Sequence, residues 1–233
     1  HEDIEAAKEC GATGVVIEIP TSEVKLKYQF PKWDTDTLIQ KSVDSCAYAK
    51  KLGLELVVDD MDFDAALLAV QQGKSDIVMA GVTVNEDRKM VMNFSDTYSK
   101  GVQVVIVKEG SDVTLDNLGD QMIGTQRGTT GYIYASGDYG EDHVTAYDNG
   151  ASAVQALANG QVDCVIIDSA PAEAFVAANP GLTILDTDYT VEDYAIGMTK
   201  DNTALLDAVN TALAELTAAG TIPAIVEKYI PTK

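Results

Sequence analysis

Ile77-Val78-Met79-Ala80-Gly81-Val82-Thr83-Val84-Asn85-Glu86-Asp87-Arg88 is the stretch from which the rest of the chain can be interpreted. Its apolar start predicts a buried strand that ends at Gly81, where the missing side chain lets a ligand approach bare backbone. Thr83 then offers an amide N–H and a hydroxyl, and Arg88 offers a planar fork of donors suited to a carboxylate. With the carbonyls of Ala80 and Gly81 for an amine, these groups suit a small zwitterion. A turn with a surface arginine is the simpler alternative.

Composition limits the possible partners. The 233 residues are 46% hydrophobic and 23% charged, which is enough for one domain or two small lobes. Lys and Arg number 16 against 37 Asp and Glu, so the net charge of -21 disfavours nucleic acid and anionic membranes as partners. The sparse cysteines and histidines predict no disulfide framework, no metal site and no cofactor. These residues are Cys10, Cys46, Cys164, His1 and His143.

The start of the sequence and its hydropathy carry little information about where the protein is located in or outside the cell. No apolar run reaches the roughly 18 residues that a membrane-spanning helix needs. The sequence begins at His1 rather than at Met, and no signal peptide is present at this start. Localisation therefore cannot be interpreted from the terminus.

Strand-like and helix-like segments alternate along the chain, which predicts an α/β fold with a mostly parallel sheet. In such sheets ligands bind at the carboxyl ends of the strands. The segments at 101–107 and 194–198 are expected to cross between two lobes that enclose a cleft and close by a hinge. Strands are predicted at 14–19, 54–58, 76–80, 101–107, 122–125, 144–147, 162–167 and 194–198, and helices at 3–10, 36–52, 63–72, after 131, and at 152–158, 170–178, 203–219 and 222–229.

Two further sites are expected in the second lobe. The turn from Gln126 through Thr129 and Thr130 to Gly131 precedes a helix, whose free N–H groups suit a carboxylate; a threonine helix cap is the alternative. Asp168 ends a strand and could pair with an ammonium group, or cap the following helix.

Phe63 and Glu173 have more ordinary alternatives. Phe63 opens a helix beside the expected cleft and could stack on a ligand, although packing in the core is the default for a single Phe. Glu173 could act as a general acid, but we expect it to face solvent. No nucleophile with a paired base and no dinucleotide fingerprint is present, which lowers the expectation of an enzyme.

From about Leu52 to the C-terminus, the chain resembles the bacterial extracellular solute-binding proteins for polar amino acids, the receptors of ABC importers. Thr97 stands where this family commonly has Pro. The resemblance implies a two-lobed, periplasmic-binding-protein-like (type II) α/β fold, with lobe 1 at 1–103 plus 192–233 and lobe 2 at 104–191. The matching pieces are Asp62-Phe63-Asp64-Ala65-Ala66-Leu67-Leu68, Gly73-Lys74-Ser75-Asp76, Ala80-Gly81-Val82-Thr83 with Glu86 and Arg88, Phe94-Ser95-Asp96-Thr97-Tyr98, Gly128-Thr129-Thr130-Gly131 and Val165-Ile166-Ile167-Asp168.

The resemblance also implies roles and partners. The protein would be a monomeric, non-catalytic receptor of a free amino acid. It would deliver this ligand to a membrane permease and be periplasmic or extracellular, lipid-anchored in the parent protein. Phe63 would stack on the ligand side chain, and Gln126 would touch the ligand from lobe 2. The carbonyls of Ala80 and Gly81 and the carboxylate of Asp168 would take the α-amine, while Thr83, Arg88 and the amides of Thr129 and Thr130 would hold the α-carboxylate.

The first 50 residues lack the family's usual aromatic-rich loop. Instead, 2–56 resembles a TIM-barrel fragment of the isopropylmalate and homocitrate synthases, without their metal-binding His pair. We interpret residues 1–55 as an atypical βα unit, and the chain as a chimera or as a naturally diverged lobe. A scaffold without a ligand, or a dehydratase-like enzyme using Glu173, are the alternative functions. The residues that carry the resemblance are Asp3-Ile4-Glu5-Ala6-Ala7, Gly11-Ala12, Pro20-Thr21-Ser22-Glu23, Leu26-Lys27-Tyr28 and Tyr48-Ala49-Lys50-Lys51-Leu52-Gly53-Leu54-Glu55.

Overall fold

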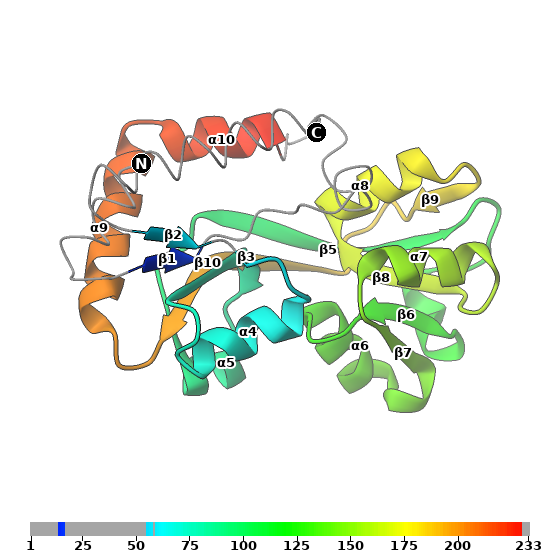
Figure 1. Cartoon of the computed structure of the whole chain (residues 1–233). Coiled ribbons are helices and arrows are strands. Elements are labelled where there is room, and N and C mark those ends of the chain that lie inside the picture. The colour runs from blue at the N-terminus through cyan, green and yellow to red at the C-terminus, as the bar shows by residue number, and fades with distance from the viewer. Residues whose placement is uncertain (1–13, 17–54, 58, 230–233) are drawn as a thin grey trace.

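Two long strands, β5 (Ser99–Lys108) and β10 (Thr190–Thr199), cross between the two halves of the molecule (Figure 1). The computed structural model describes residues 14–16, 55–57 and 59–229. β5 and β10 pair antiparallel over Ser99 to Gln103 and Thr190 to Tyr194. They correspond to the two crossing segments expected from the sequence, and each extends further than predicted.

β5 and β10 lie side by side inside one sheet of order β3-β10-β5-β8-β6-β7, with β4 added beside β10 and β9 beside β5. β10 pairs antiparallel with β3, β4 and β5, and β5 pairs antiparallel with β8 and β9. Only β6 pairs parallel with its neighbours β7 and β8 in this sheet. The expectation of a mostly parallel sheet is therefore wrong for the described residues, because each crossing strand runs opposite to the strands on both of its sides.

Lobe 1 is our name for the half that holds β3 (Ile77–Thr83), β4 (Met92–Phe94), α4 (Phe63–Gln71) and α5 (Glu86–Val91). α4 fits its prediction because apolar residues recur at helical spacing and Gly73 follows with a positive φ of 66°. α5 was expected only as a turn. The buried core of this half consists of Ala66, Leu67, Val70, Val78, Val82 and Met92.

Lobe 2 is our name for the half that holds β6–β9 and α6–α8. Its sheet is covered on both faces, which follows from the two-residue alternation of strand side chains. Val104 and Ile106 of β5 pack in one core cluster, and Val105 and Val107 pack in the other. The elements are β6 (Ile123–Gln126), α6 (Thr130–Tyr139), β7 (Val144–Tyr147), α7 (Gly150–Ala158), β8 (Cys164–Asp168), α8 (Ser169–Ala178) and β9 (Leu182–Ile184), with the 3₁₀ turns η1 (Leu115–Asp120) and η2 (Glu141–His143).

The chain ends with two helices, α9 (Thr203–Ala218) and α10 (Thr221–Tyr229), close to their predicted bounds. Near the other end, β1 (Gly14–Val16) and β2 (Glu55–Val57) form a separate parallel pair, within the strands predicted at 14–19 and 54–58. The helices predicted at 3–10 and 36–52 lie outside the described residues.

Gly81 does not end its strand, which corrects the sequence-based prediction. β3 continues to Thr83, and Gly81 lies inside it with a φ of +63°. The pairing with β10 shifts here: Val82 faces Ala195, whereas Val78 faces Gly197. Extra β3 residues thus bulge opposite a single β10 residue, a geometry that the positive φ of a glycine permits. The bulge sets the position of Thr83 at the junction of the two lobes.

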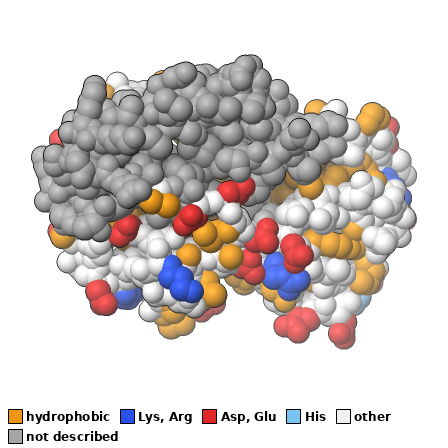
Figure 2. All heavy atoms as spheres, in the orientation of Figure 1, with side chains coloured by type: hydrophobic (Ala, Val, Ile, Leu, Met, Phe, Trp, Pro, Cys, Tyr) orange, Lys and Arg blue, Asp and Glu red, His pale blue; other side chains and the backbone are white. Residues whose placement is uncertain are grey.

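The acidic composition is visible on the surface. Figure 2 shows acidic side chains on both halves of the face it presents, with few basic ones among them. Among the described residues, no helix is both long enough and apolar enough to cross a membrane.

Candidate functional site

Arg88 is buried, with 6% of its surface exposed, although it belongs to a short helix. Asn85 caps this helix and accepts a hydrogen bond from the backbone N–H of Arg88 at 2.8 Å. The guanidinium carbon lies 5.5 Å from the centre of the Phe63 ring, within cation–π range. The alternative of a surface arginine is therefore wrong, because the side chain of Arg88 is buried.

The Arg88 guanidinium bridges the two lobes. Its Nη1 donates to the carbonyl of Thr83 at 2.8 Å, and its Nη2 donates to the carbonyl of Gly128 in lobe 2 at 2.9 Å. Burial lowers the pKa of Arg88, and the Glu192 carboxylate opposes that shift. A guanidinium has five N–H donors, so these two bonds leave donors that could take a carboxylate.

Gly128 of lobe 2 lies directly against α4 of lobe 1. Its φ is +75°, and a Cβ added there would lie 2.8 Å from the Cβ of Asp64 in α4. Glycine is required on both counts, because other residues rarely adopt this φ and no side chain fits the space. The structure therefore shows the two lobes in contact across their junction.

The hydroxyl of Thr83 lies in a buried polar chain. Its Oγ1 donates to Glu192 Oε2 at 3.1 Å and lies 3.3 Å from Thr130 Oγ1 at the start of α6. Gln103 Nε2 donates to the same Glu192 oxygen at 3.0 Å. We call these four residues, Thr130, Thr83, Glu192 and Gln103, the Glu192 relay. Each is at most 6% exposed.

The turn before α6 contains the expected threonine cap. Thr129 Oγ1 accepts from the N–H of Tyr132 at 3.4 Å and donates to the carbonyl of Gln126 at 2.8 Å. The cap that was given as an alternative is thus present for the side chain of Thr129. The following residue, Thr130, instead points its hydroxyl to Thr83. The turn therefore brings both the start of α6 and Gly128 to the lobe junction.

Asp168 ends β8 and holds the N-cap position of α8. Its Oδ1 accepts a 2.5 Å hydrogen bond from the hydroxyl of Tyr194, on β10. Burial raises the pKa of the Asp168 carboxyl, and the Tyr194 hydroxyl and backbone N–H groups oppose this shift only in part. Asp168 is thus a partly buried acid held by a side chain from a crossing strand.

Tyr98 lies in the same region as Asp168. Its hydroxyl oxygen accepts a 3.3 Å hydrogen bond from the N–H of Gly81, on β3. Burial and the nearby charge of Asp168 raise the pKa of Tyr98 to about 12. Gly81 also faces the Tyr194 ring, 3.4 Å from where its Cβ would stand. We call Gly81, Tyr98, Asp168 and Tyr194 the Asp168 cluster.

The remaining candidates are placed as follows. Phe63 and Ala80 are partly buried and pack against the core of lobe 1, so Phe63 fulfils the packing role that was its default. Glu173 is exposed on α8, as expected. Cys164 is free and buried, and burial raises its pKa to about 12. Within the described part of the chain, no group of His, Cys, Asp and Glu could hold a metal ion.

Sequence reasoning missed Glu192, Gln103, Tyr98 and Tyr194. Two of them carry a detectable signal, because Gln103 interrupts the apolar run of β5 and Glu192 lies two positions before Tyr194, on the same face of β10. The predicted strand at 194–198 began too late to include Glu192. A single polar side chain in a buried strand needs a hydrogen-bonding partner, and that requirement was the usable signal.

Residues 44–232 match the family described as bacterial extracellular solute-binding proteins, family 3. The chain belongs to this family. It is 33% identical over 190 residues to a probable histidine-binding protein of Neisseria gonorrhoeae, covering 78% of this chain and 71% of the relative. It is 29% identical over 190 residues to the ABC transporter arginine-binding protein 1 of Escherichia coli K12, covering 79% and 78%.

Solved structures agree with the fold. A mutant of ArgBP from T. maritima superposes with a TM-score of 0.78 at 31% identity, covering 99% of this chain and all of that one. The two-lobed type II fold expected from the sequence is confirmed. The chain is a solute-binding receptor and not an enzyme, so the dehydratase-like alternative is wrong.

The barrel-like resemblance of residues 2–56 stays a prediction. Most of these residues lie outside the described part of the chain, and the family match begins only at residue 44. The choice between a chimera and a diverged lobe is therefore not tested by the fold of residues 59–229.

Proposed function

We propose that this receptor binds a free amino acid at the junction of its lobes, with the carboxylate at Arg88 and the ammonium at Asp168. The observation that carries the proposal is a buried arginine and a partly buried aspartate, of opposite charge, at this junction. Arg88 comes from lobe 1 and reaches Gly128 in lobe 2, and Asp168 comes from lobe 2 and contacts Tyr194 on a crossing strand. A zwitterion offers each of these charges its complement.

Other groups at the junction support the same orientation. The N-terminus of α6, which starts at Thr130 after the Thr129 cap, favours a negative group. Ala80 and Gly81 lie in the bulge of β3, where Gly81 contacts Tyr98 and Tyr194 of the Asp168 cluster, and their carbonyls suit an ammonium group. The ring of Phe63 and the side chain of Gln126 are the candidates for contact with the ligand side chain.

The relatives support the choice of ligand and partner. The histidine- and arginine-binding names of two relatives favour a basic amino acid. We infer that the chain passes this ligand to the permease of an ABC importer and works as a monomer in the periplasm or outside the cell, with a lipid anchor on the parent protein. The hinge would lie at 103/104 in β5 and 191/192 in β10, which divides lobe 1 (1–103 and 192–233) from lobe 2 (104–191).

The first test is a thermal-shift screen of the full chain against L-arginine, L-histidine and L-glutamine, followed by the other amino acids. A ligand that binds only the folded chain raises its melting temperature. For each amino acid that produces a shift, its methyl ester and its N-acetyl derivative are then compared. We expect both derivatives to lose most of the shift, since each removes one charge of the zwitterion.

A matched pair of variants links the shift to the site. Asp168→Asn should weaken the amino acid effect, whereas Asp193→Asn, at an exposed position of β10, should leave it unchanged. No shift with any amino acid in a cooperatively folded chain would overturn the proposal and favour a scaffold without a ligand. A full shift with the esters would overturn the assignment of the carboxylate to Arg88.

A further inference from the structure

Glu192 is a buried carboxylate on a crossing strand, outside every pattern that the sequence analysis used. Only 6% of its surface is exposed. Its Oε2 accepts from both Thr83 and Gln103. Its Oε1 is buried without a partner in good hydrogen-bonding geometry, and the Tyr134 hydroxyl of α6 lies close to the carboxylate. A buried carboxylate costs free energy unless its contacts compensate, so the hydrogen bonds to Glu192 indicate a structural role for it.

The direction of the hydrogen bonds in the relay follows from proton counting. A threonine hydroxyl has a single hydrogen, and an ionised carboxylate only accepts. Since Thr83 donates to Glu192 Oε2, the Thr83 oxygen must accept from the hydroxyl of Thr130. The Thr130 hydroxyl therefore donates to Thr83, and the Thr83 hydroxyl donates to Glu192. Without an acceptor at residue 192, Thr83 would have no fixed orientation toward Thr130.

The relay joins the parts of the molecule that a hinge must move. Thr83 ends β3 in lobe 1, and Thr130 starts α6 in lobe 2. Glu192 and Gln103 lie on β10 and β5, the two strands that cross between the lobes. The Thr83–Thr130 contact exists only while the lobes are together, whereas the bonds from Glu192 to Thr83 and Gln103 can persist when they separate.

We infer that Glu192 is a positioning residue that stabilises the joined lobes: it orients the Thr83 hydroxyl as an acceptor for Thr130. This role goes beyond the proposed function and does not depend on which ligand binds. The role requires an acceptor oxygen at residue 192 rather than a negative charge. Glutamine supplies such an oxygen with the same shape, and leucine does not.

The burial of Oε1 separates this role from direct ligand contact. An oxygen with almost no accessible surface cannot touch a ligand in this arrangement of the lobes. Gln103 Nε2 donates to the same carboxylate of Glu192. Within the relay, Glu192 therefore acts through Thr83, and the Tyr134 hydroxyl of α6 is its other neighbour from lobe 2.

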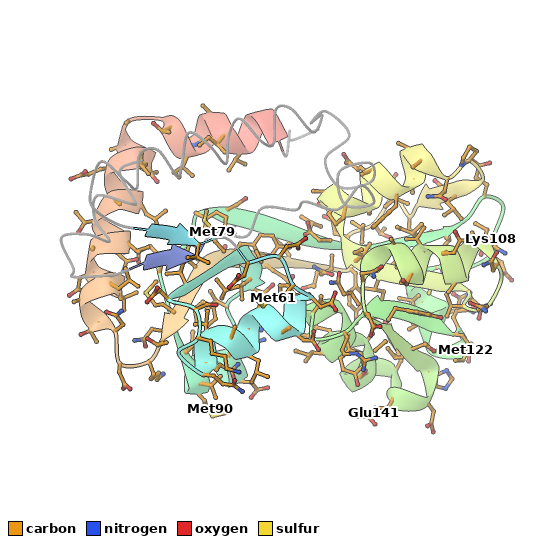
Figure 3. All side chains as sticks on the ribbon, viewed as in Figure 1. Met61, Met79, Met90, Lys108, Met122 and Glu141 are labelled. Atoms are coloured by element: carbon orange, nitrogen blue, oxygen red, sulfur yellow. The ribbon has the colours of Figure 1, made fainter. Side chains whose placement is uncertain are left out.

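The experiment measures the distance between the lobes in the full chain. Met90, which is 72% exposed on α5, and Glu141, exposed in η2, extend from the two lobes along the same edge in Figure 3. Replacing both with a bio-orthogonal amino acid allows attachment of a fluorophore pair without using the native cysteines. Single-molecule energy transfer then gives the ratio of joined to separated lobes, without ligand and with 10 mM L-arginine as an added probe.

In this doubly labelled background, Glu192→Leu should lower the joined-to-separated ratio about five- to tenfold, as expected for the loss of one buried hydrogen bond. Glu192→Gln should keep the ratio within about twofold, because its oxygen still accepts from Thr83. Thr130→Val should lower the ratio as much as Glu192→Leu. The double variant should add little, since both changes break the same chain.

Asp193→Leu is the matched control, because its side chain is exposed one position further along β10. Circular dichroism and urea unfolding check that each variant folds, and Thr130→Val keeps the test valid if Glu192→Leu does not. An unchanged ratio in Thr130→Val overturns the inference. So does a loss in Glu192→Gln equal to that in Glu192→Leu, which would assign the effect to charge. These outcomes are independent of the amino acid screen, so the proposed function can fail without the inference failing.

Discussion

The two ends of the lobe junction use their charged side chains in different ways. At the Arg88 end, the cation donates to backbone carbonyls of both lobes, so the charge holds the junction together by itself. At the Asp168 end, the carboxylate accepts from Tyr194, a side chain of a crossing strand. One end therefore couples the lobes through backbone carbonyls, and the other ties lobe 2 to a side chain of the crossing strand β10.

The difference has an energetic consequence. A guanidinium remains protonated even when burial lowers its pKa, so the Arg88 end keeps its charge at every accessible pH. The Asp168 carboxyl has a raised pKa, so its charge depends on Tyr194 and on pH. Changes at the Arg88 end should therefore cost more, and changes at the Asp168 end should depend on pH.

Arg88→Met gives the largest expected effect. The carbonyls of Thr83 and Gly128 would lose a charged donor in a buried site, which should lower the free energy of unfolding by about 3 kcal/mol. Urea denaturation followed by circular dichroism measures this. Lys89→Met is the matched control, because Lys89 forms an exposed ion pair with Glu86 that contributes little. Equal losses in the two variants would refute the role of Arg88 at the junction.

Gly128→Ala should lower the free energy of unfolding by about 2 kcal/mol. One part comes from the positive φ of this residue, and the other part comes from the contact of the new Cβ with Asp64. Gly110→Ala separates the two parts, since Gly110 has the same φ of 75° and nothing within 4 Å of its would-be Cβ. Urea unfolding of both variants gives the difference that belongs to the lobe contact. If the two variants lose the same stability, the approach of Gly128 to Asp64 is not a feature of the folded chain in solution.

Tyr194→Phe should have the smallest effect and lower the free energy of unfolding by about 1 kcal/mol near neutral pH. Because the pKa of Asp168 is raised above 3.8 on folding, its contribution to stability is complete below pH 3.8 and is lost as pH rises through the folded pKa. Removing the Tyr194 hydroxyl raises that pKa further. The loss in free energy of unfolding relative to wild type should therefore be larger at pH 7 than at pH 3. Urea unfolding at the two pH values measures this loss.

Tyr189→Phe is the control for this pH dependence. Tyr189 donates to the carboxylate of Asp138 at 2.6 Å, but that carboxylate is exposed to solvent. Between pH 3 and pH 7, the loss in free energy of unfolding caused by Tyr189→Phe should change less than the loss caused by Tyr194→Phe. A pH-independent deficit in Tyr194→Phe would show that Asp168 does not titrate through this bond.

Much of the site could be predicted because its signals are local. The turn at Gln126 to Gly131 is encoded by a threonine cap and by Gly128, whose φ few other residues adopt. Asp168 could be placed because a buried strand ends there. Arg88 was named as a candidate, but its burial could not be foreseen, since it depends on contacts with Phe63 and Gly128, which are distant in sequence.

The rest depended on contacts between residues far apart in sequence. Glu192 and Thr83 are 109 positions apart, and Tyr194 and Asp168 are 26 apart on different strands. The antiparallel order of the sheet also could not be predicted, because strand periodicity is the same in parallel and antiparallel pairing.

The sequence by itself determined most of the longer helices and strands among the described residues, the family and most of the charged candidates, because hydrophobic period, glycine positions and caps act within a few residues. Only the tertiary structure decided that Arg88 spans both lobes, that Gly81 forms a bulge inside β3, and that Glu192 connects the crossing strands to both threonines. The physical reason is that burial and hydrogen-bond pairing depend on which distant segments meet, and that information appears only when the chain is packed.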